Sequence, residues 1–423
     1  MQLRFIYTII FITLLSAELP IGFTEEEWGN RHLIQQMGHR TDPPPGPIRA
    51  IAEYEPMQGV LIRYPLGIST SLVKELAEDD IVYCLVSSAS QSSAYNSLNN
   101  ANVNMDNVEF IIGSTDSHWT RDYGPWWVLD GNGDLSIVDF TYNRPRPNDN
   151  EVPQRVSSFL DVPYYSADLV HTGGNYMTDG FGTAASTQIA YTENNECGTN
   201  DSWSIPLAPC NYVNNIMEEY YGILEYHVVA DPNDEYIDHI DCWGKYLSPN
   251  KVLIRSVPVS HSQYSMIEEV ADYFEDTTTP SGNSWQVFRV YTPYDQPYSN
   301  SLILNNKVFL PIMNSSWDDD AVSVYQEALP DHEILTYTGS WYPTDALHCR
   351  TRGIPDLTYI SFQLGDVNMD EAINILDIVI TVNAILGTSE LSSAQIQLAD
   401  LNADDNINIL DIVLIVNLVL EGN

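Results

Sequence analysis

A cysteine near the end of a long globular region is the first residue whose surroundings indicate chemistry. Cys349 lies in the stretch Thr344–Gly353, and Arg350 and Arg352 follow it closely. A thiol beside cationic groups is biased toward the thiolate, which is the nucleophilic form. An ordinary buried or disulfide-bonded cysteine would fit the same stretch, so residues elsewhere in the chain must decide between the two.

A segment rich in tryptophan and aspartate, residues 116–127, offers groups that suit a flat cation. It follows an apolar, strand-like run at 108–112, so we expect a loop at a strand end, where binding groups are often held. Asp122 can bind a cation, and Trp119 can lie against the flat face of that cation. The alternative is a structural ion pair between Arg121 and Asp122 beneath an aromatic cluster.

The segment Tyr236–Trp243 places a histidine two residues before a carboxylate. If this segment is a strand, His239 and Asp241 point to the same face. A histidine that transfers protons, beside a carboxylate that binds charge, is a plausible catalytic pair. A metal site made by His239, Asp241 and Cys242 is the alternative, although no second histidine or cysteine cluster has ligand spacing.

Two arginines separated by prolines, Arg144 and Arg146, lie in the stretch Thr141–Asn148. Proline restricts the backbone, so both guanidinium groups can be held toward one point. Paired arginine forks are well suited to a carboxylate. A solvated basic turn is the alternative.

Together these groups describe the hydrolysis of an arginine side chain. Asp122 and Asp241 suit a planar guanidinium, which offers several N–H donors. The thiolate of Cys349 would attack the central carbon, and His239 would protonate the departing ammonia. Water activated by the same histidine would then release citrulline from the thiouronium intermediate. This chemistry requires no metal or organic cofactor.

The elements that must position these residues follow a strand–helix–strand rhythm along the chain. Such repetition predicts an α/β protein built of repeated units. The expected strand, helix and strand are 59–64, 69–79 and 81–86 in the first unit, 251–259, 261–274 and 286–291 in another, and 301–310, 318–328 and 333–338 in a third.

The region after residue 363 contains a direct repeat with the spacing of calcium-binding loops. Oxygen-bearing side chains recur at loop positions 1, 3, 5, 9 and 12, and each loop leads into an apolar helix, at 378–386 and 412–420. Glu371 and Asp405 stand where such loops usually carry glycine. The predicted Ca²⁺ ligands are Asp366, Asn368, Asp370, Asn374 and Asp377 in the first loop and Asp400, Asn402, Asp404, Asn408 and Asp411 in the second.

The amino terminus reads as an export signal. Residues 1–17 combine a positive flank with an apolar run too short to span a bilayer as a mature helix; an uncleaved anchor is the alternative. Residues 18–49 form a polar lead-in that ends in a proline-rich, extended spacer. Export permits disulfides, and we expect Cys197 and Cys210, which flank a short loop, to be bridged. With five cysteines, at least one thiol stays free.

The charge balance excludes some partners. A formal net charge of −41 disfavours nucleic acid and anionic membrane surfaces, which require lysine and arginine. It suits a cationic substrate, calcium, or solubility in salty surroundings. We expect a protein without a membrane span after signal cleavage, either secreted or attached to the cell surface.

Several stretches together resemble the bacterial peptidylarginine deiminase and agmatine deiminase family over residues 50–362. They are Glu53–Val60, Trp119–Trp126, Gly173–Asn175, His239–Asp241 and His348–Cys349. The resemblance implies the pentein fold, a five-bladed propeller of ββαβ units. It also implies that Cys349 is the nucleophile, His239 the general acid and base, Asp122 and Asp241 the guanidinium carboxylates, Trp119, Tyr236 and Ile237 pocket walls, and Asn300 a polar residue near the nucleophile.

Within that family, the pair Arg144 and Arg146 resembles the clamp with which the secreted bacterial peptidylarginine deiminase holds a terminal carboxylate. C-terminal arginine of peptides or proteins is therefore the expected substrate. Deimination of free arginine or agmatine is one alternative, and a catalytically silent pentein-fold binding module is another. Residues 363–423 resemble a type I dockerin, which implies a cohesin-like partner; a calcium-stabilised cap without a partner is the alternative.

Overall fold

The structure is a computed structural model of the chain. It describes residues 18–46, 48–194, 197, 204–234, 236–278, 284–357, 365–368, 372–389, 391, 393–401 and 406–421. The predicted signal, residues 1–17, and the predicted calcium ligands Asp370, Asn402 and Asp404 lie outside this part of the chain. No helix within it is long and apolar enough to cross a membrane.

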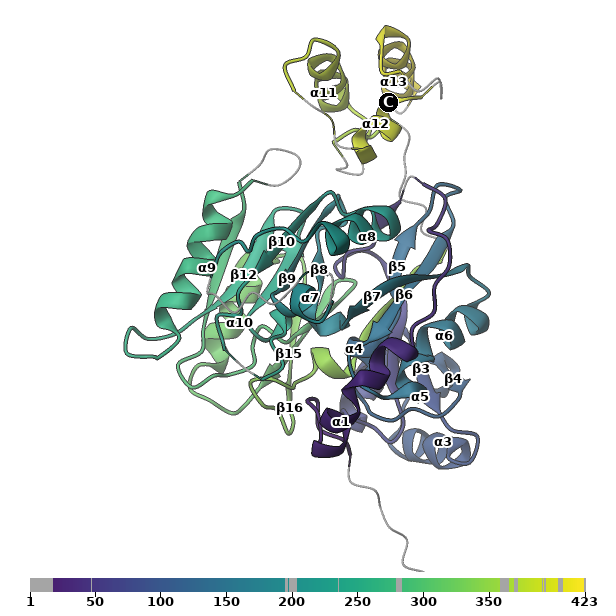
Figure 1. Cartoon of the computed structure of the whole chain (residues 1–423), viewed down its shortest axis with the longest axis vertical. Coiled ribbons are helices and arrows are strands. Elements are labelled where there is room, and N and C mark those ends of the chain that lie inside the picture. Colours follow the sequence, from purple (N-terminus) through teal and green to yellow (C-terminus); the bar gives the residue numbers. More distant parts are fainter. Residues whose placement is uncertain are drawn as a thin grey trace, which may run out of the picture.

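The first of five sheets joins the beginning of the large unit to its end (Figure 1). Its elements are β2 (Met57–Arg63), α2 (Thr70–Asp79), β3 (Ile81–Val86), α3 (Gln91–Asn100), η2 (Met105–Asn107), β4 (Val108–Ile112) and β17 (Arg352–Pro355). Strands β2, β3 and β4 are parallel, and β17 lies antiparallel to β2. This pairing brings the segment that follows Cys349 back to the first strand of the unit.

The other four sheets repeat one pattern of an antiparallel pair, a helix and a third, parallel strand. The second sheet and its helices are β1 (Arg49–Ala50), β5 (Trp126–Leu129), β6 (Leu135–Tyr142), α5 (Pro147–Asn150), α6 (Val152–Leu160) and β7 (Tyr164–His171). The third consists of β8 (Met177–Thr178), β9 (Thr183–Thr187), α7 (Ile189–Thr192), α8 (Asn211–Tyr221) and β10 (Glu225–Val229). The fourth consists of β11 (Gly244–Ser248), β12 (Lys251–Ser256), α9 (Tyr264–Asp276) and β13 (Gln286–Tyr291), and the fifth of β14 (Leu302–Leu304), β15 (Lys307–Ile312), α10 (Asp318–Ala328) and β16 (Glu333–Thr338). Short strand β1 adds to the edge of β5.

Local sequence explains why these elements form where they do. The Ser69 hydroxyl accepts a hydrogen bond from Leu72 N and so caps α2. The predicted α/β rhythm is confirmed, but the strand expected at 301–310 is a hairpin. Asn305 has a φ of 52° and forms the turn between β14 and β15, because asparagine tolerates the left-handed region.

The polar lead-in contains helical structure ahead of its proline-rich end. Helix α1 (Glu25–Asn30) and the 3-10 helix η1 (Arg31–Gln36) fold against the large unit and bury Ile21 and Ile34. Thr24 starts α1 because its hydroxyl accepts from Glu27 N while the Glu27 carboxylate accepts from Thr24 N.

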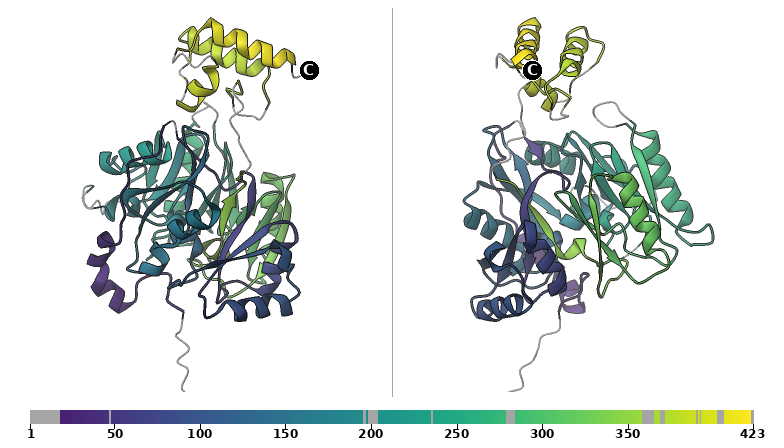
Figure 2. Two further views of the ribbon diagram at one scale, coloured as in Figure 1. Left: turned by 90° about the vertical axis from the view of Figure 1, so that its right-hand side faces the viewer. Right: turned by 180° about the vertical axis from the view of Figure 1, so that it is seen from behind.

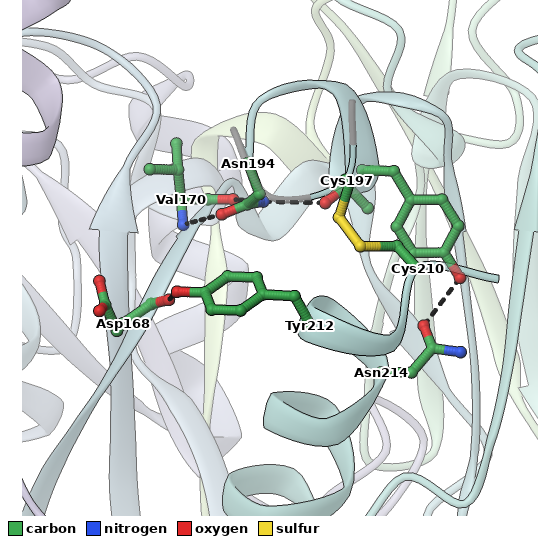
Figure 3. The surroundings of a disulfide bond; sticks show 9 residues. Asp168, Val170, Asn194, Cys197, Cys210, Tyr212 and Asn214 are labelled. Atoms are coloured by element: carbon green, nitrogen blue, oxygen red, sulfur yellow. Dashed lines mark hydrogen bonds between the residues drawn. A yellow bond between two sulfur atoms is a disulfide. The ribbon is translucent and has the colours of Figure 1, made fainter. Parts of the chain in front are cut away.

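The predicted disulfide between Cys197 and Cys210 is confirmed. It lies at the amino-terminal end of α8 (Figure 3), where Tyr212 donates to the carbonyl oxygen of Asp168 at 2.6 Å. Three cysteines, Cys84, Cys242 and Cys349, are free and buried.

The C-terminal helices lie apart from the sheets (Figure 2). They are α11 (Ile375–Ile385), α12 (Ser393–Ala399) and α13 (Ile409–Glu421), and they surround a small core of Val367, Ala399 and Ile415. Helices α11 and α13 each begin three residues earlier than predicted. The reason is capping: Asn374 Oδ1 accepts from Leu376 N at 2.8 Å, and Asn408 Oδ1 accepts from Leu410 N at 2.9 Å.

Candidate active site

The thiol of Cys349 is buried and unbridged in the 3-10 turn η6 (His348–Arg350). Its Sγ lies 3.3 Å from Asn300 Nδ2 and 3.8 Å from Asp241 Oδ2. The backbone N–H of Cys349 also donates to Asn300 Oδ1 at 3.3 Å. Two residues that the sequence assigned to the site from distant segments therefore contact the sulfur, and the disulfide alternative for this cysteine is wrong.

His239 and Asp122 form a second pair of buried polar groups. His239 Nδ1 lies 3.6 Å from Asp122 Oδ1, and both side chains are almost completely buried. Among the described residues, neither ring nitrogen of His239 nor this oxygen of Asp122 has a hydrogen-bond partner. Buried polar atoms are nearly always paired in folded proteins, so these three atoms indicate the position of a polar ligand.

The glycine turn η3 (Gly173–Asn175) brings this pair together. A Cβ on Gly174 would lie 2.5 Å from His239 Nδ1 and 2.6 Å from Asp122 Oδ1, so only glycine fits. Asn175 Oδ1 accepts from the backbone of Ile240 at 3.2 Å and of Thr187 at 2.9 Å. Asn175 thereby fixes the loop that carries His239.

The segment around His239 is not the strand that was considered from the sequence. Asp238 has a φ of 51°, which a strand cannot contain, and His239 directly precedes the 3-10 turn η5 (Ile240–Cys242). A turn, rather than a shared strand face, therefore places His239 beside Asp122 and Asp241 beside the thiol.

A charged network holds Asp241 from behind. His348 Nδ1 lies 2.6 Å from Asp241 Oδ2, and His348 Nε2 lies 2.6 Å from Glu53 Oε2. The imidazole of His348 is thus held between these two acids by its two ring nitrogens. Glu53 is itself paired with Arg121 and Lys245, each at 2.9 Å. The ion pair of Arg121 is thus with Glu53, and the alternative pairing of Arg121 with Asp122 is not observed.

The electrostatics of the substrate-free site favour a neutral thiol. Burial, followed by the charges of Asp241 and Asp122, raises the pKa of Cys349 well above its usual value. The expectation that Arg350 and Arg352 favour the thiolate is therefore wrong. Arg350 binds Asp345 at 2.6 Å and Arg352 donates to the carbonyl oxygen of Pro125 at 2.8 Å, so neither guanidinium is used on the sulfur.

The pKa values of the other titratable groups at the site are shifted as well. Burial, then the charge of Asp241, raises the pKa of Asp122 well above its ordinary value. Burial lowers the pKa of His239 to about 3, so its imidazole is neutral near pH 7. Burial alone would raise the pKa of Asp241, but the hydrogen bond to His348 and the charge of that residue bring it below the usual value. A bound cation would reverse the shifts of Asp122 and Cys349.

Of the predicted pocket walls, two are buried and one is exposed. Trp119 and Ile237 belong to the same cluster of buried side chains as Cys349. Tyr236 is 67% exposed, and its ring approaches Gly22, where a Cβ would lie 2.5 Å from the ring. Tyr236 therefore lies at the rim rather than in the interior.

Arg144 and Arg146 are only 3% and 1% exposed, so they do not form a solvated basic turn. Other parts of the chain also cover their guanidinium groups. Arg146 Nε donates to Glu27 Oε1 at 2.7 Å, and Arg144 Nε donates to the carbonyl oxygen of Ile21 at 3.2 Å. The N-terminal lead-in thus covers both arginines.

Sequence reasoning gave no role to four residues that organise the site. Glu53 and His348 lie in stretches that carry the family resemblance. The signal that could have indicated their role was a charged residue just before a buried strand. Gly174 and Asn175 were a short glycine turn, whose importance depends on a three-dimensional approach that sequence spacing does not reveal.

Comparison with known proteins identifies the chain. A family model described as Porphyromonas-type peptidyl-arginine deiminase matches residues 50–355. The chain belongs to this family. It is therefore a pentein-family deiminase, a hydrolase of amidine C–N bonds, rather than a silent binding module. A second model, the type I dockerin domain, matches residues 364–420.

The names of similar proteins carry more than one substrate. A solved protein assigned as a peptidyl-arginine deiminase has a TM-score of 0.63 at 18% identity and covers 73% of this chain and 99% of that chain. A protein assigned as an agmatine deiminase in Mycoplasma mycoides subsp. mycoides is 26% identical over 310 residues, which cover 64% of this chain and 81% of that protein. The agmatine deiminase of Ectopseudomonas mendocina is 23% identical over 339 residues, covering 68% and 86%. The solved agmatine deiminase of Enterococcus faecalis has a TM-score of 0.61 at 18% identity and covers 81% of this chain and 100% of that chain. At this identity the structural likeness shows the pentein α/β fold alone.

Because nearby acids raise the pKa of Cys349, removing one of them should change the alkylation rates of this thiol by neutral and by cationic reagents in opposite directions. Asp241→Asn removes the ionised carboxylate that, after burial, contributes most to the raised pKa of the thiol, so alkylation by neutral iodoacetamide near pH 7 should become roughly tenfold faster, as one pKa unit implies. Alkylation by the cationic 2-chloroacetamidine should become at least roughly tenfold slower. Peptide mass mapping of Cys349 measures both rates. Asp139→Asn, a buried acid outside this cluster, is the control, and rates that move in the same direction would contradict the electrostatic account.

Proposed function

We propose that this chain is an exported deiminase that converts peptidyl-arginine, preferably at a peptide's C-terminus, to citrulline and ammonia. The observation that carries the proposal is the set of unpaired buried atoms of Asp122 and His239 beside the free thiol of Cys349. A guanidinium is planar, permanently charged and rich in N–H donors. It supplies both the hydrogen bonds and the positive charge that this site lacks.

Binding comes first. The guanidinium lies between Asp122 and Asp241, and Trp119 packs against it. Its charge lowers the pKa of the thiol, which burial and the two acids otherwise raise. The substrate thus activates its own nucleophile, so Cys349 is unreactive until a cation arrives.

The chemical steps then use His239 as a shuttle. The thiol proton moves to His239 while Sγ bonds to the central guanidinium carbon. His239 returns the proton to one amino group, and ammonia leaves with the C–N electron pair. Water attacks the resulting thiouronium carbon as His239 accepts one of its protons; the C–S bond breaks, and the thiolate regains that proton. The hydroxyl proton is also released, so guanidinium and water yield citrulline and ammonium.

The arginine pair supports a substrate with a terminal carboxylate. Arg144 and Arg146 are buried near the site, and their charges act on Asp122. Arg146 already binds a carboxylate, that of Glu27, with two nitrogen–oxygen contacts of 2.7 and 3.2 Å. The same fork would hold the carboxylate of a C-terminal arginine.

A second candidate is the deimination of agmatine or free arginine. The names of the similar proteins favour agmatine. Agmatine has no carboxylate, and its amine end would gain nothing from Arg144 and Arg146. Free arginine would satisfy the pair as a peptide does.

The five sheets also support a finer account of the architecture. We infer that they are the blades of the ββαβ propeller, since four repeat that order and the fifth obtains its outer strand from β17. We propose domain boundaries at 50–362 for the deiminase and 363–423 for the dockerin. Residues 1–17 would direct export, followed by free secretion or surface attachment through a cohesin-like partner.

We further propose that the dockerin domain binds Ca²⁺ through its two loops. Asp377 and Asp411 are fully buried, and each accepts from the asparagine three residues before it, at 2.7 Å in the first loop and 2.9 Å in the second. Oxygen ligands of this kind suit Ca²⁺. No group of three or more His, Cys, Asp or Glu side chains arranged for a metal occurs within the described residues, which omit one predicted ligand of the first loop and two of the second.

A substrate panel tests the specificity. Wild-type enzyme should release citrulline faster from a peptide ending in arginine than from the same peptide as its amide or from agmatine, and Cys349→Ala should abolish all three activities. Arg146→Ala should raise the KM for the free-acid peptide at least roughly tenfold, as loss of a charge-assisted fork implies, and change that for the amide little. Arg155→Ala, an arginine of α6, is the control. Equal changes for acid and amide would overturn the clamp.

Chelation tests the calcium proposal. Removing Ca²⁺ with EGTA should abolish a separate thermal transition of the dockerin domain, because each ion at about 100 times its Kd stabilises the folded state by about 2.7 kcal/mol. The kcat for citrulline release should not change, since no catalytic step uses the ion. Calorimetry and an ammonia assay on one sample measure both. An unchanged melting profile would contradict calcium binding.

A further inference from the structure

The segment Glu18–Glu27, here called the covering segment, occupies the arginine pair from the amino-terminal side. Its backbone accepts from Arg146 Nη2 at Pro20 O, 2.6 Å, and at Gly22 O, 3.0 Å. Phe23 lies against Arg144, with 4.3 Å between the guanidinium carbon and the ring centre. These contacts occupy Arg146 Nη2 and one face of the Arg144 guanidinium, which a substrate carboxylate would otherwise approach.

The covering segment also reaches the pocket wall. Ile21 is buried in the same cluster of apolar side chains as Trp119, Ile237 and Cys349. Gly22 approaches the exposed ring of Tyr236 so closely that a side chain would collide with it. At its start, Glu18 pairs with Arg63 at 2.9 Å. The segment is therefore anchored along its length rather than loosely draped over the surface.

Glu27 is the last residue of the covering segment, and its carboxylate contacts the guanidinium of Arg146. Its side chain is largely buried, and the two contacts to Arg146 have the fork geometry of arginine–carboxylate recognition. Thr24 holds Glu27 in place through the capping box of α1. A free carboxylate from a ligand would make the same contacts, so the two cannot bind Arg146 together.

We propose that Glu27 is a specificity-determining residue that mimics the substrate carboxylate on Arg146. A substrate that bears a carboxylate near its arginine must displace Glu27 and release the covering segment. A guanidinium compound without a carboxylate has no group to exchange for Glu27 and leaves it bound. This inference rests on the proposed clamp, and it makes the clamp a competition between an internal and an external carboxylate.

The competition has a measurable consequence. A tethered group acts at a high effective concentration, on the order of millimolar for a short flexible link. The internal carboxylate therefore raises the KM for carboxylate-bearing substrates, and its removal should lower that KM without a comparable change for substrates that lack the group.

Glu27→Gln is the sharpest variant, because glutamine preserves the capping box with Thr24 and removes only the charge that Arg146 binds. Glu26→Gln, an exposed neighbour in α1, is the matched control. For a peptide ending in arginine, Glu27→Gln should lower the KM at least roughly tenfold at unchanged kcat; for the peptide amide and agmatine the change should stay below about threefold. An equal gain for all substrates would overturn the proposal and leave the segment a steric cover only.

A second measurement separates this inference from the proposed function. In Cys349→Ser protein, hydrogen exchange of residues 18–28 should rise when free arginine is added and stay unchanged with agmatine. Faster exchange with arginine would support the competition between Glu27 and the ligand carboxylate. If wild-type enzyme showed no activity on peptides, the peptide substrate would be refuted while the competition stood. Protection that persists with both ligands would overturn the competition itself.

Discussion

The structure depends on one electrostatic constraint: two carboxylates, those of Asp122 and Asp241, are buried in one cluster with the thiol of Cys349. Burial and mutual repulsion raise the pKa of Asp122 and Cys349. Such a cluster is stable only while its charge is low, so protons remain on the acid and the sulfur. In the proposed mechanism, the charge of a bound guanidinium removes this constraint and lowers the pKa of the thiol next to the carbon that it attacks. Substrate binding and activation of the nucleophile are the same event in that mechanism.

The rest of the fold serves to hold this unfavourable arrangement. His348 and Glu53 anchor Asp241, and Arg121 and Lys245 balance Glu53. Glu53 and His348 come from opposite ends of the large unit. The pairing of β17 with β2 joins those ends, and without it Cys349 would have no fixed distance to the acids. A site assembled from so many segments needs a rigid, closed frame.

The sequence predicted the chemical groups better than their environment. Residue types and family resemblance indicated Cys349, His239, Asp122 and Asp241, and periodicity predicted β3, β4, β13 and α10 to the residue. The turn at Asp238 and the hairpin at Asn305 were missed, because left-handed residues break a strand without changing its composition. The raised pKa of the thiol was missed because it depends on burial and on the approach of Asp241 and Asp122, which the local sequence does not show. The cover over Arg144 and Arg146 depends on a long-range contact, which no local pattern encodes.

The central claim is that Cys349 carries the guanidinium carbon during turnover. Acid quenching within milliseconds of mixing enzyme with an arginine substrate, followed by peptide mass spectrometry, tests it directly. The account predicts that the peptide containing Cys349 gains the mass of the substrate less ammonia, and that no such adduct forms on Cys242 or Cys84. Citrulline produced with an unmodified Cys349 at every time point, or an adduct on another cysteine, would contradict it.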